Sequence, residues 1–222
     1  MTRNVPPPVA LITGAADGIG WAMARRFAAA GCRVALADLD GDRAAARAAE
    51  LGAHHLAVRA DVADEDSAVA MIEETVAQLG RLDILVNNAG IGDSHKPTLE
   101  QDLATFDRIL RIHLDGTFVA SREAARAMAE QGGAILNVSS IAGLTGLPRR
   151  NAYGAAKAGL DAYVRYLAEE SGDALTAFSF VPGLTNTAMQ ETLRTVDAER
   201  FPQVEQFRRD VETAVREGRI GY

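Results

Sequence analysis

The sequence predicts an α/β fold in which helices cover both faces of one doubly wound, parallel sheet of about six strands. Three observations lead to this prediction. Short apolar, β-branched runs alternate with longer helical patterns, no internal repeat interrupts that order, and a Gly-rich turn directly follows the first apolar run. Right-handed crossovers between parallel strands place helices on both faces. Residues 1–222 are therefore expected to form one domain.

The strands and helices are expected in strict alternation. The runs expected to be strands are Val9–Thr13, Arg33–Ala37, His55–Arg59, Ile84–Asn87, Ala134–Val138 and Thr176–Val181. The helical patterns between them cover Ile19–Ala30, Asp42–Leu51, Asp64–Leu79, Leu103–Glu130 and Ala152–Glu170. Ligands of such sheets bind at the carboxyl ends of the strands, near the point where the strand order reverses. Polar motifs that directly follow strands are therefore the candidate site residues.

Composition and charge exclude several classes of protein. No apolar run approaches the roughly 20 residues of a membrane helix, and Met1–Pro8 lacks the apolar centre of a signal peptide, so we expect a cytoplasmic protein without a membrane partner. A net charge of -7 without a basic stripe argues against nucleic acid as a partner. Cys32 is the only cysteine, which excludes an internal disulfide and a thiolate-held metal; we interpret it as a small core residue.

The turn Thr13-Gly14-Ala15-Ala16-Asp17-Gly18-Ile19-Gly20 lies between the first predicted strand and the first helix. Its glycines allow a tight turn, close approach of a pyrophosphate and tight helix packing, which is typical of a Rossmann-like dinucleotide site. Asp38, followed by Leu39, ends the second strand about 20 residues later, where a carboxylate binds the adenosine ribose and repels a 2′-phosphate. With Asp17 as a second negative charge, NAD is favoured over NADP. The alternative for Asp38 is a simple turn residue.

Further motifs follow in a fixed order along the chain: Asn87-Asn88-Ala89-Gly90, Asn137-Val138-Ser139-Ser140, Tyr153-Gly154-Ala155-Ala156-Lys157 and Pro182-Gly183. Together with the Gly-rich turn they span residues 9–190, and this ordered set resembles the short-chain dehydrogenase/reductase family. The resemblance implies an oxidoreductase that moves a hydride between NAD(H) and a secondary alcohol or ketone. It also implies a homodimer or homotetramer.

Tyr153 and Lys157 are four residues apart, so on a helix both side chains leave the same face. A tyrosine with its ordinary pKa near 10 is a poor base at neutral pH, but a nearby ammonium favours the phenolate. We therefore predict that Tyr153 exchanges the proton with the substrate and that the charge of Lys157 favours the phenolate form of Tyr153. Ser140, at the tip of the fifth strand, is expected to hydrogen-bond the substrate oxygen.

The resemblance implies further contacts with the cofactor. Asn87 is expected to brace the turn around Thr13 instead of touching the cofactor. The supporting residues other than Tyr153 and Lys157 could each also be a plain turn or cap residue. The implied cofactor contacts are Asp61 and Val62 beside the adenine, Asn88, Ala89 and Gly90 beside a ribose, Tyr153 and Lys157 at the nicotinamide ribose, and Pro182, Gly183, Thr185 and Thr187 at the carboxamide.

Two features depart from the family pattern. His113 occupies a position where the family usually has Asn, whose backbone carbonyl holds a water leading to the lysine. As fourth member of the catalytic set, His113 is either a buried, hydrogen-bonded residue or a titrating participant in proton transfer. The second departure is the C-terminal region, where the family's next helix and seventh strand are not readable. Residues 185–217 are instead expected to form a helical lid over the substrate.

Substrate choice is expected to come from the loops Ile91–Glu100, Ile141–Asn151 and Leu184–Phe201. Their apolar residues are mixed with His95, Arg149 and Arg150. A cationic rim suits a substrate with an acid group, although solvent-facing arginines are commoner. Two alternatives to a dehydrogenase stay open: an NAD-binding sensor or scaffold that has lost turnover, and an enzyme that uses its cofactor internally for epimerisation or dehydration.

Overall fold

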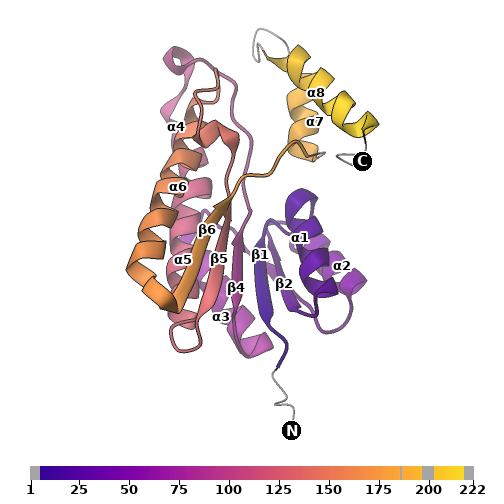
Figure 1. Cartoon of the computed structure of the whole chain (residues 1–222), viewed down its shortest axis with the longest axis vertical. Coiled ribbons are helices and arrows are strands. Elements are labelled where there is room, and N and C mark those ends of the chain that lie inside the picture. Colours follow the sequence, from indigo (N-terminus) through magenta and orange to yellow (C-terminus); the bar gives the residue numbers. More distant parts are fainter. Residues whose placement is uncertain (1–5, 186, 197–202, 218–222) are drawn as a thin grey trace.

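Six parallel strands form one sheet in the order β3-β2-β1-β4-β5-β6 (Figure 1). The computed structural model describes residues 6–185, 187–196 and 203–217. The order reverses between the neighbours β1 and β4, which is where ligands of such sheets bind. The predicted doubly wound sheet is confirmed, with each strand within one residue of its expected bounds: β1 Val9–Thr13, β2 Arg33–Asp38, β3 Leu56–Arg59, β4 Ile84–Asn87, β5 Gly133–Val138 and β6 Leu175–Phe180.

Helices cover both faces of the sheet because successive strand residues point to opposite sides. Leu11 packs in a cluster with residues of α3 (Glu65–Leu79) and α5 (Gly116–Ala127). Its neighbour Ile12 packs on the other face. That face is covered by α1 (Gly18–Ala29) and α2 (Gly41–Leu51). The longest helix, α6 (Asn151–Ser171), packs along β6 on the α5 side of the sheet (Figure 1).

The helix predicted over Leu103–Glu130 is interrupted. It consists of α4 (Leu103–Leu110), a π-helical turn η2 (Arg111–Asp115) and α5. A π turn adds one residue within an otherwise continuous helix, so the apolar period on either side still reads as one helix. Such turns are frequent at functional sites, and this one contains His113.

Two helices follow β6, namely α7 (Ala188–Thr195) and α8 (Val204–Arg216). They pack on one another through Leu193, Val204 and Phe207. Figure 1 shows them at the end of the sheet where the strands finish, opposite the N-terminus. Within the predicted lid region 185–217, residue 186 and residues 197–202 lie outside the described residues.

No strand follows β6 in the described part of the chain, so β6 is an edge strand there. Phe178 and Phe180 are each 46% exposed. They pair with Leu136 and Val138 of β5, which belong to the cluster on the α1 side of the sheet. The cover that α1 and α2 give to that face therefore does not reach β6.

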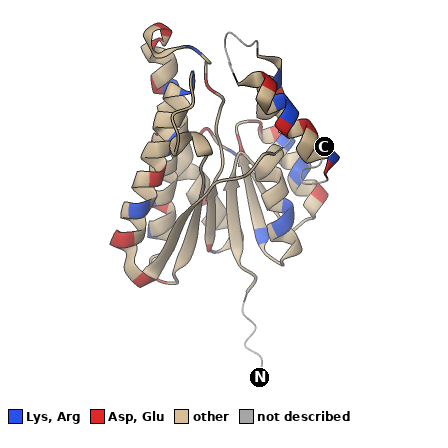
Figure 2. Cartoon of the chain, turned by 45° about the horizontal axis from the view of Figure 1, so that its top comes forward, with Lys and Arg blue, Asp and Glu red and all other residues tan. Residues whose placement is uncertain are grey.

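Charged residues lie mainly on the outer helices and loops, and the strands carry few of them (Figure 2). None of the described helices is long and apolar enough to cross a membrane. Among the same residues no group of three or more His, Cys, Asp or Glu side chains could hold a metal ion. Cys32 is partly buried and packs at the edge of the α1 cluster.

Candidate active site

A cavity of about 820 Å³ opens at the carboxyl ends of the strands, between the Gly-rich turn and the start of α6. Of the residues predicted for the site, Gly20 alone does not line it. The predicted residues that the fold brings to its wall are Gly14, Asp17, Gly18, Ile19, Asp38, Leu39, Asp61, Val62, Asn88, Ala89, Gly90, His113, Ser140, Tyr153, Lys157, Pro182, Gly183, Thr185 and Thr187.

The Gly-rich turn leads directly into α1. Asp17 caps the helix, since its Oδ1 accepts the Gly18 N–H at 2.8 Å. Gly20 lies so close to the carbonyl of Gly14 that a Cβ has no room. The turn therefore lets α1 approach β1 closely and aims the helix N-terminus at the cavity, which fits the pyrophosphate of a dinucleotide.

Asn88 braces this turn, and the prediction that Asn87 does so is wrong. Asn88 Nδ2 donates to the carbonyls of Thr13 and Gly14 at 2.9 and 3.1 Å, and Thr13 Oγ1 accepts the Asn88 N–H at 3.0 Å. Asn87 points to the opposite side of β4, where its Nδ2 donates to Ser121 and Asn137. Side chains alternate along a strand, so adjacent asparagines reach different faces.

Asp38 is held in a fixed orientation beside the turn. Its Oδ2 accepts the Ala16 N–H and its Oδ1 accepts the Asp40 N–H, both at 3.0 Å. The sequence did not indicate the partner of Asp17: Arg43, on α2, forms an ion pair with it at 2.9 Å. Because both side chains are about half exposed, this pair weakens the repulsion of a phosphate by Asp17 only in part. Asp38 itself lines the cavity at the end of β2.

Ser140, Tyr153 and Lys157 meet at the carboxyl end of β5. Lys157 is 4% exposed, and its Nζ donates to the Val138 carbonyl at 2.7 Å and lies 5.7 Å from the centre of the Tyr153 ring. Burial lowers the pKa of Lys157 to about 8. The side chain of Ser140 lies close enough to the Tyr153 phenol to lower its pKa. A phenol, a hydroxyl and an ammonium therefore belong to the wall of one cavity.

The expected lowering of the Tyr153 pKa is not found in this structure. Burial raises the pKa of Tyr153, and the Ser140 side chain and the charge of Arg150 oppose the rise. The chain alone therefore holds Tyr153 as a neutral phenol, which is the form that donates a proton to a carbonyl. Sequence spacing indicated the neighbouring ammonium but could not indicate how deeply the ring is buried.

Asp161 is a charged residue of the site that the sequence analysis missed. It lies one turn after Lys157 on α6 and is 8% exposed. Its Oδ2 accepts the hydroxyl of Ser139 at 2.8 Å, and its charge raises the pKa of Lys157 against the effect of burial. The spacing of Tyr153, Lys157 and Asp161 at four-residue intervals was a signal that could have found it.

His113 braces the backbone that follows β4. Its Nε2 lies 2.9 Å from the Ile91 carbonyl oxygen and 3.1 Å from the Ile91 nitrogen, so the ring contacts this peptide in either tautomer. Gly90 leaves no room for a Cβ against the imidazole. Burial and, to a smaller extent, the charge of Lys157 lower the pKa of His113 to about 3. The neutral, hydrogen-bonded form is therefore the one that fits.

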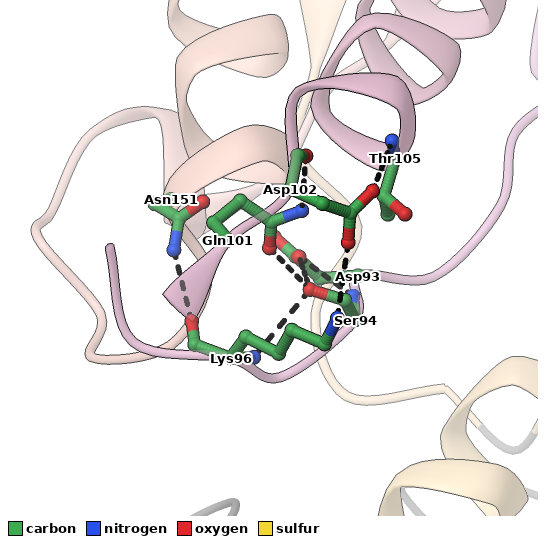
Figure 3. A network of polar contacts seen from close by, with 7 residues as sticks. All are labelled: Asp93, Ser94, Lys96, Gln101, Asp102, Thr105 and Asn151. Atoms are coloured by element: carbon green, nitrogen blue, oxygen red, sulfur yellow. Dashed lines mark hydrogen bonds and ion pairs between the residues drawn. The ribbon is translucent and has the colours of Figure 1, made fainter. Parts of the chain in front are cut away.

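The loop after β4 is tied to the start of α6 by a network of polar contacts (Figure 3). Asn151 Nδ2 donates to the Lys96 carbonyl at 2.9 Å, and Lys96 Nζ binds Asp102 at 3.0 Å. Asp93, which is 9% exposed, accepts the backbone N–H of Tyr153 at 2.9 Å. Asp93 thus fixes the first turn of α6, although no sequence motif marked it.

Comparison with known proteins agrees with this geometry. A family model described as short chain dehydrogenase matches residues 8–198. The 2-dehydro-3-deoxy-L-rhamnonate dehydrogenase (NAD(+)) of Sphingomonas sp. (strain SKA58) is 38% identical over 186 residues, which cover 83% of this chain and 74% of that protein. The cis-4-hydroxycyclohexanecarboxylate dehydrogenase of Sinomonas cyclohexanicum is 40% identical over 185 residues, covering 82% and 74% of the two chains.

A solved structure is similar as well. The 3-ketoacyl-(acyl-carrier-protein) reductase from Brucella melitensis, crystallised with NADH, superposes with a TM-score of 0.80 at 34% identity. The match covers 83% of this chain and 78% of the reductase. The chain therefore belongs to the short-chain dehydrogenase/reductase family, and it is an oxidoreductase of the kind that uses a nicotinamide cofactor.

Proposed function

We propose that the protein is an NAD-dependent dehydrogenase that interconverts a secondary alcohol and a ketone, with Tyr153 as the acid/base. The observation that carries the proposal is the meeting of Ser140, Tyr153 and Lys157 in the wall of the cavity that the Gly-rich turn and Asp38 also line. One cavity thus brings together a dinucleotide-binding turn and a proton donor.

Tyr153, Ser140 and Lys157 each have a separate role in the proposed reaction. Bound nicotinamide supplies or accepts the hydride. In reduction the Tyr153 phenol gives its proton to the carbonyl oxygen of the substrate, and Ser140 donates a hydrogen bond to the same oxygen as charge develops on it. In oxidation Tyr153 takes the hydroxyl proton back. The ammonium of Lys157 stabilises the Tyr153 phenolate, which is left after the proton is given in reduction and which accepts the proton in oxidation. Three residues of α7 and α8 also line the cavity: Met189, Leu193 and Phe207.

Asp38 makes NAD the expected cofactor. At about 100 times its Kd, NAD should stabilise the protein by about 2.7 kcal/mol, which raises the Tm by roughly 5–10 °C, whereas NADP at the same concentration should raise it far less. The reason is that the Asp38 carboxylate lines the cavity at the end of β2, where it would repel a phosphate on the ribose. Thermal unfolding with each dinucleotide measures the difference. Asp38→Asn should reduce the difference between the Tm shifts caused by NAD and by NADP. A shift with NADP that equals or exceeds the shift with NAD in the parent would overturn the assignment of NAD as the cofactor.

His113 is expected to act through the Ile91 backbone, not by titration. In His113→Asn the pH dependence of kcat/KM should superimpose on that of the parent above pH 5, because the His113 pKa of about 3 leaves the ring neutral throughout. The variant keeps an amide that can bind the Ile91 peptide. A limb of the parent profile that disappears in the variant would instead assign His113 to proton transfer.

A sensor or scaffold that binds NAD without turnover is the main alternative. Incubating the protein with NAD and a panel of secondary alcohols separates the two functions, since a dehydrogenase produces NADH absorbance and a sensor does not.

A homo-oligomer also stays a prediction. The family resemblance implies that the long helices over Leu103–Glu130 and Ala152–Glu170 form the dimer interface, and Phe118 on α5 and Tyr166 on α6 are exposed apolar residues of these regions. Light scattering would measure the mass of the particle.

A further inference from the structure

Two opposite charges are buried close together on α6, next to the end of β5. Lys157 is 4% exposed and Asp161 is 8% exposed, and they lie one helical turn apart on the same face of the helix. Lys157 Nζ donates to the Val138 carbonyl at 2.7 Å. Asp161 Oδ2 accepts the hydroxyl of Ser139, the next residue, at 2.8 Å. Two consecutive residues at the end of β5 therefore hold both charges in place.

The hydrogen bond from Ser139 does not explain why the residue at position 161 is charged. A neutral amide could accept the same bond, whereas a buried carboxylate loses its hydration and is costly unless an opposite charge compensates it. Oδ1 of Asp161 is buried and has no hydrogen-bond partner among the described residues. Asp161 does not line the cavity, so a ligand in the cavity does not reach it. The compensating charge therefore belongs to the protein.

Lys157 supplies this compensating charge. Burial lowers the pKa of Lys157 to about 8, and the charge of Asp161 opposes the fall. The carboxylates that line the cavity lie elsewhere, after β1, β2 and β3: Asp17, Asp38 and Asp61. Without Asp161, Lys157 would be a buried cation with no counter-charge, and such a group gives up its proton more readily.

Few other titratable groups of the described chain face Lys157. On α6 the ring centre of Tyr153 lies 5.7 Å from Nζ, and Arg150, which precedes the helix, acts on Tyr153. On η2 the buried ring of His113 is neutral. The strands β5 and β6 and the short helix η3 (Ile141–Gly143) contain no charged residue. The charged residues of the other elements that pack against α6 are exposed: Asp107, Arg108, Arg111, Asp115 and Asp173.

We propose that Asp161 is a positioning residue of the active site, whose carboxylate keeps Lys157 an ammonium while Tyr153 gives and takes its proton. The proposal rests on the proposed function and adds a residue to it. Because Asp161 lies outside the cavity wall, it acts through Lys157 and not on the substrate. In reduction Tyr153 becomes a phenolate, which the ammonium stabilises. A Lys157 that had lost its proton would leave the phenolate without this charge, and proton donation would slow.

The first test reads the protonation of Lys157 by NMR in protein without cofactor. Lys96 and Lys157 are the only lysines of the sequence, so isotope-labelled lysine gives two side-chain signals, which Lys96→Met assigns. In the parent the Lys157 signal should titrate near pH 8. Asp161→Asn keeps an oxygen for the Ser139 hydroxyl and removes the charge, so the Lys157 midpoint should fall by about one pH unit or more. The signal of Lys96, which is about half exposed, is the internal reference.

Glu169→Gln is the matched control, because it removes one negative charge from an exposed position of the same helix. It should leave the Lys157 midpoint and the turnover at the parent values. Asp161→Glu restores the charge and should bring the midpoint back toward that of the parent. An unchanged midpoint in Asp161→Asn overturns the proposal. If that variant does not fold, the parent still decides: the Asp161 carboxyl carbon signal should inflect at the Lys157 midpoint, and a signal that does not inflect there overturns the proposal.

The second test follows the pH dependence of kcat/KM for the reduction of cyclohexanone and ethyl acetoacetate with NADH. On the alkaline side kcat/KM should fall as Lys157 loses its proton, because Tyr153, whose pKa is raised by burial, still keeps its own. In Asp161→Asn this limb should move to lower pH by about one unit, which makes the variant about tenfold slower than the parent at pH 9 and close to it at pH 6. A purely structural role of Asp161 would slow the variant by a similar factor at every pH, and that outcome overturns the proposal.

The two tests also separate this proposal from the proposed function. If the Lys157 midpoint shifts while the parent reduces no ketone, Asp161 stands as the counter-charge of Lys157 and the dehydrogenase proposal fails. If the parent reduces ketones and the alkaline limb of Asp161→Asn does not move, the dehydrogenase proposal stands and the role of Asp161 in the reaction is overturned.

Discussion

Tyr153→Phe should lose about 10²- to 10⁴-fold in kcat, the range typical of removing a general acid/base. The substitution deletes only the phenolic hydroxyl, whose pKa the neighbouring Ser140 side chain lowers. The ring keeps its edge-to-face contact with His113, whose centre lies 5.1 Å away. The fold and the cofactor site should therefore survive, and the measurement is steady-state turnover together with the Tm shift caused by the cofactor. The KM should change little, because the lost interaction belongs to the transition state.

Tyr163→Phe is the matched control for this variant. Tyr163 lies on the same helix, its ring contacts Phe118, and its hydroxyl does not line the cavity. Losing that hydroxyl should leave kcat near the parent value. If Tyr153→Phe kept near-normal turnover with every substrate that the parent accepts, the assignment of the acid/base would fail.

The sheet could be predicted because its causes are local. A strand such as Val9–Thr13, buried on both faces, is a short apolar run, and the glycines after it permit only a few kinds of turn. The π turn at Arg111–Asp115 could not be predicted, since its extra residue leaves the apolar period on either side unchanged. Likewise, the exchange of roles between Asn87 and Asn88 depends on which face of β4 each side chain takes.

The candidate site was predictable where its chemical groups come from residues that lie close together in the sequence. Tyr153 and Lys157 are one helical turn apart, so their meeting follows from the period of the helix. The carboxylates Asp93 and Asp161 act across elements, one on the amide of Tyr153 and the other beside Lys157. Their roles come from tertiary packing and from burial, which the sequence does not specify. The same cause explains why the direction of the Tyr153 pKa shift was missed.

Lys157→Met should lower kcat by about 10²-fold or more, because no other ammonium lines the described cavity to stabilise a phenolate at Tyr153. It should also change how stability depends on pH. The pKa of Lys157 is about 8 in the folded protein, compared with about 10.4 for a lysine in an unfolded chain. Between these values the unfolded parent binds more protons than the folded parent, so the parent gains stability as pH rises through this window.

The gain amounts to about 3 kcal/mol, since each unit of pKa difference corresponds to about 1.4 kcal/mol. It is complete above pH 10.4 and is lost as pH falls through 8. Urea unfolding of parent and Lys157→Met at pH 7–10 measures it as a difference that grows with pH. Lys96→Met is the control, because Lys96 is the other lysine and its side chain is about half exposed. A parent-minus-variant difference that stays flat with pH would mean that Lys157 is not buried as a cation, and the proposed stabilisation of the Tyr153 phenolate by a desolvated ammonium would then fail.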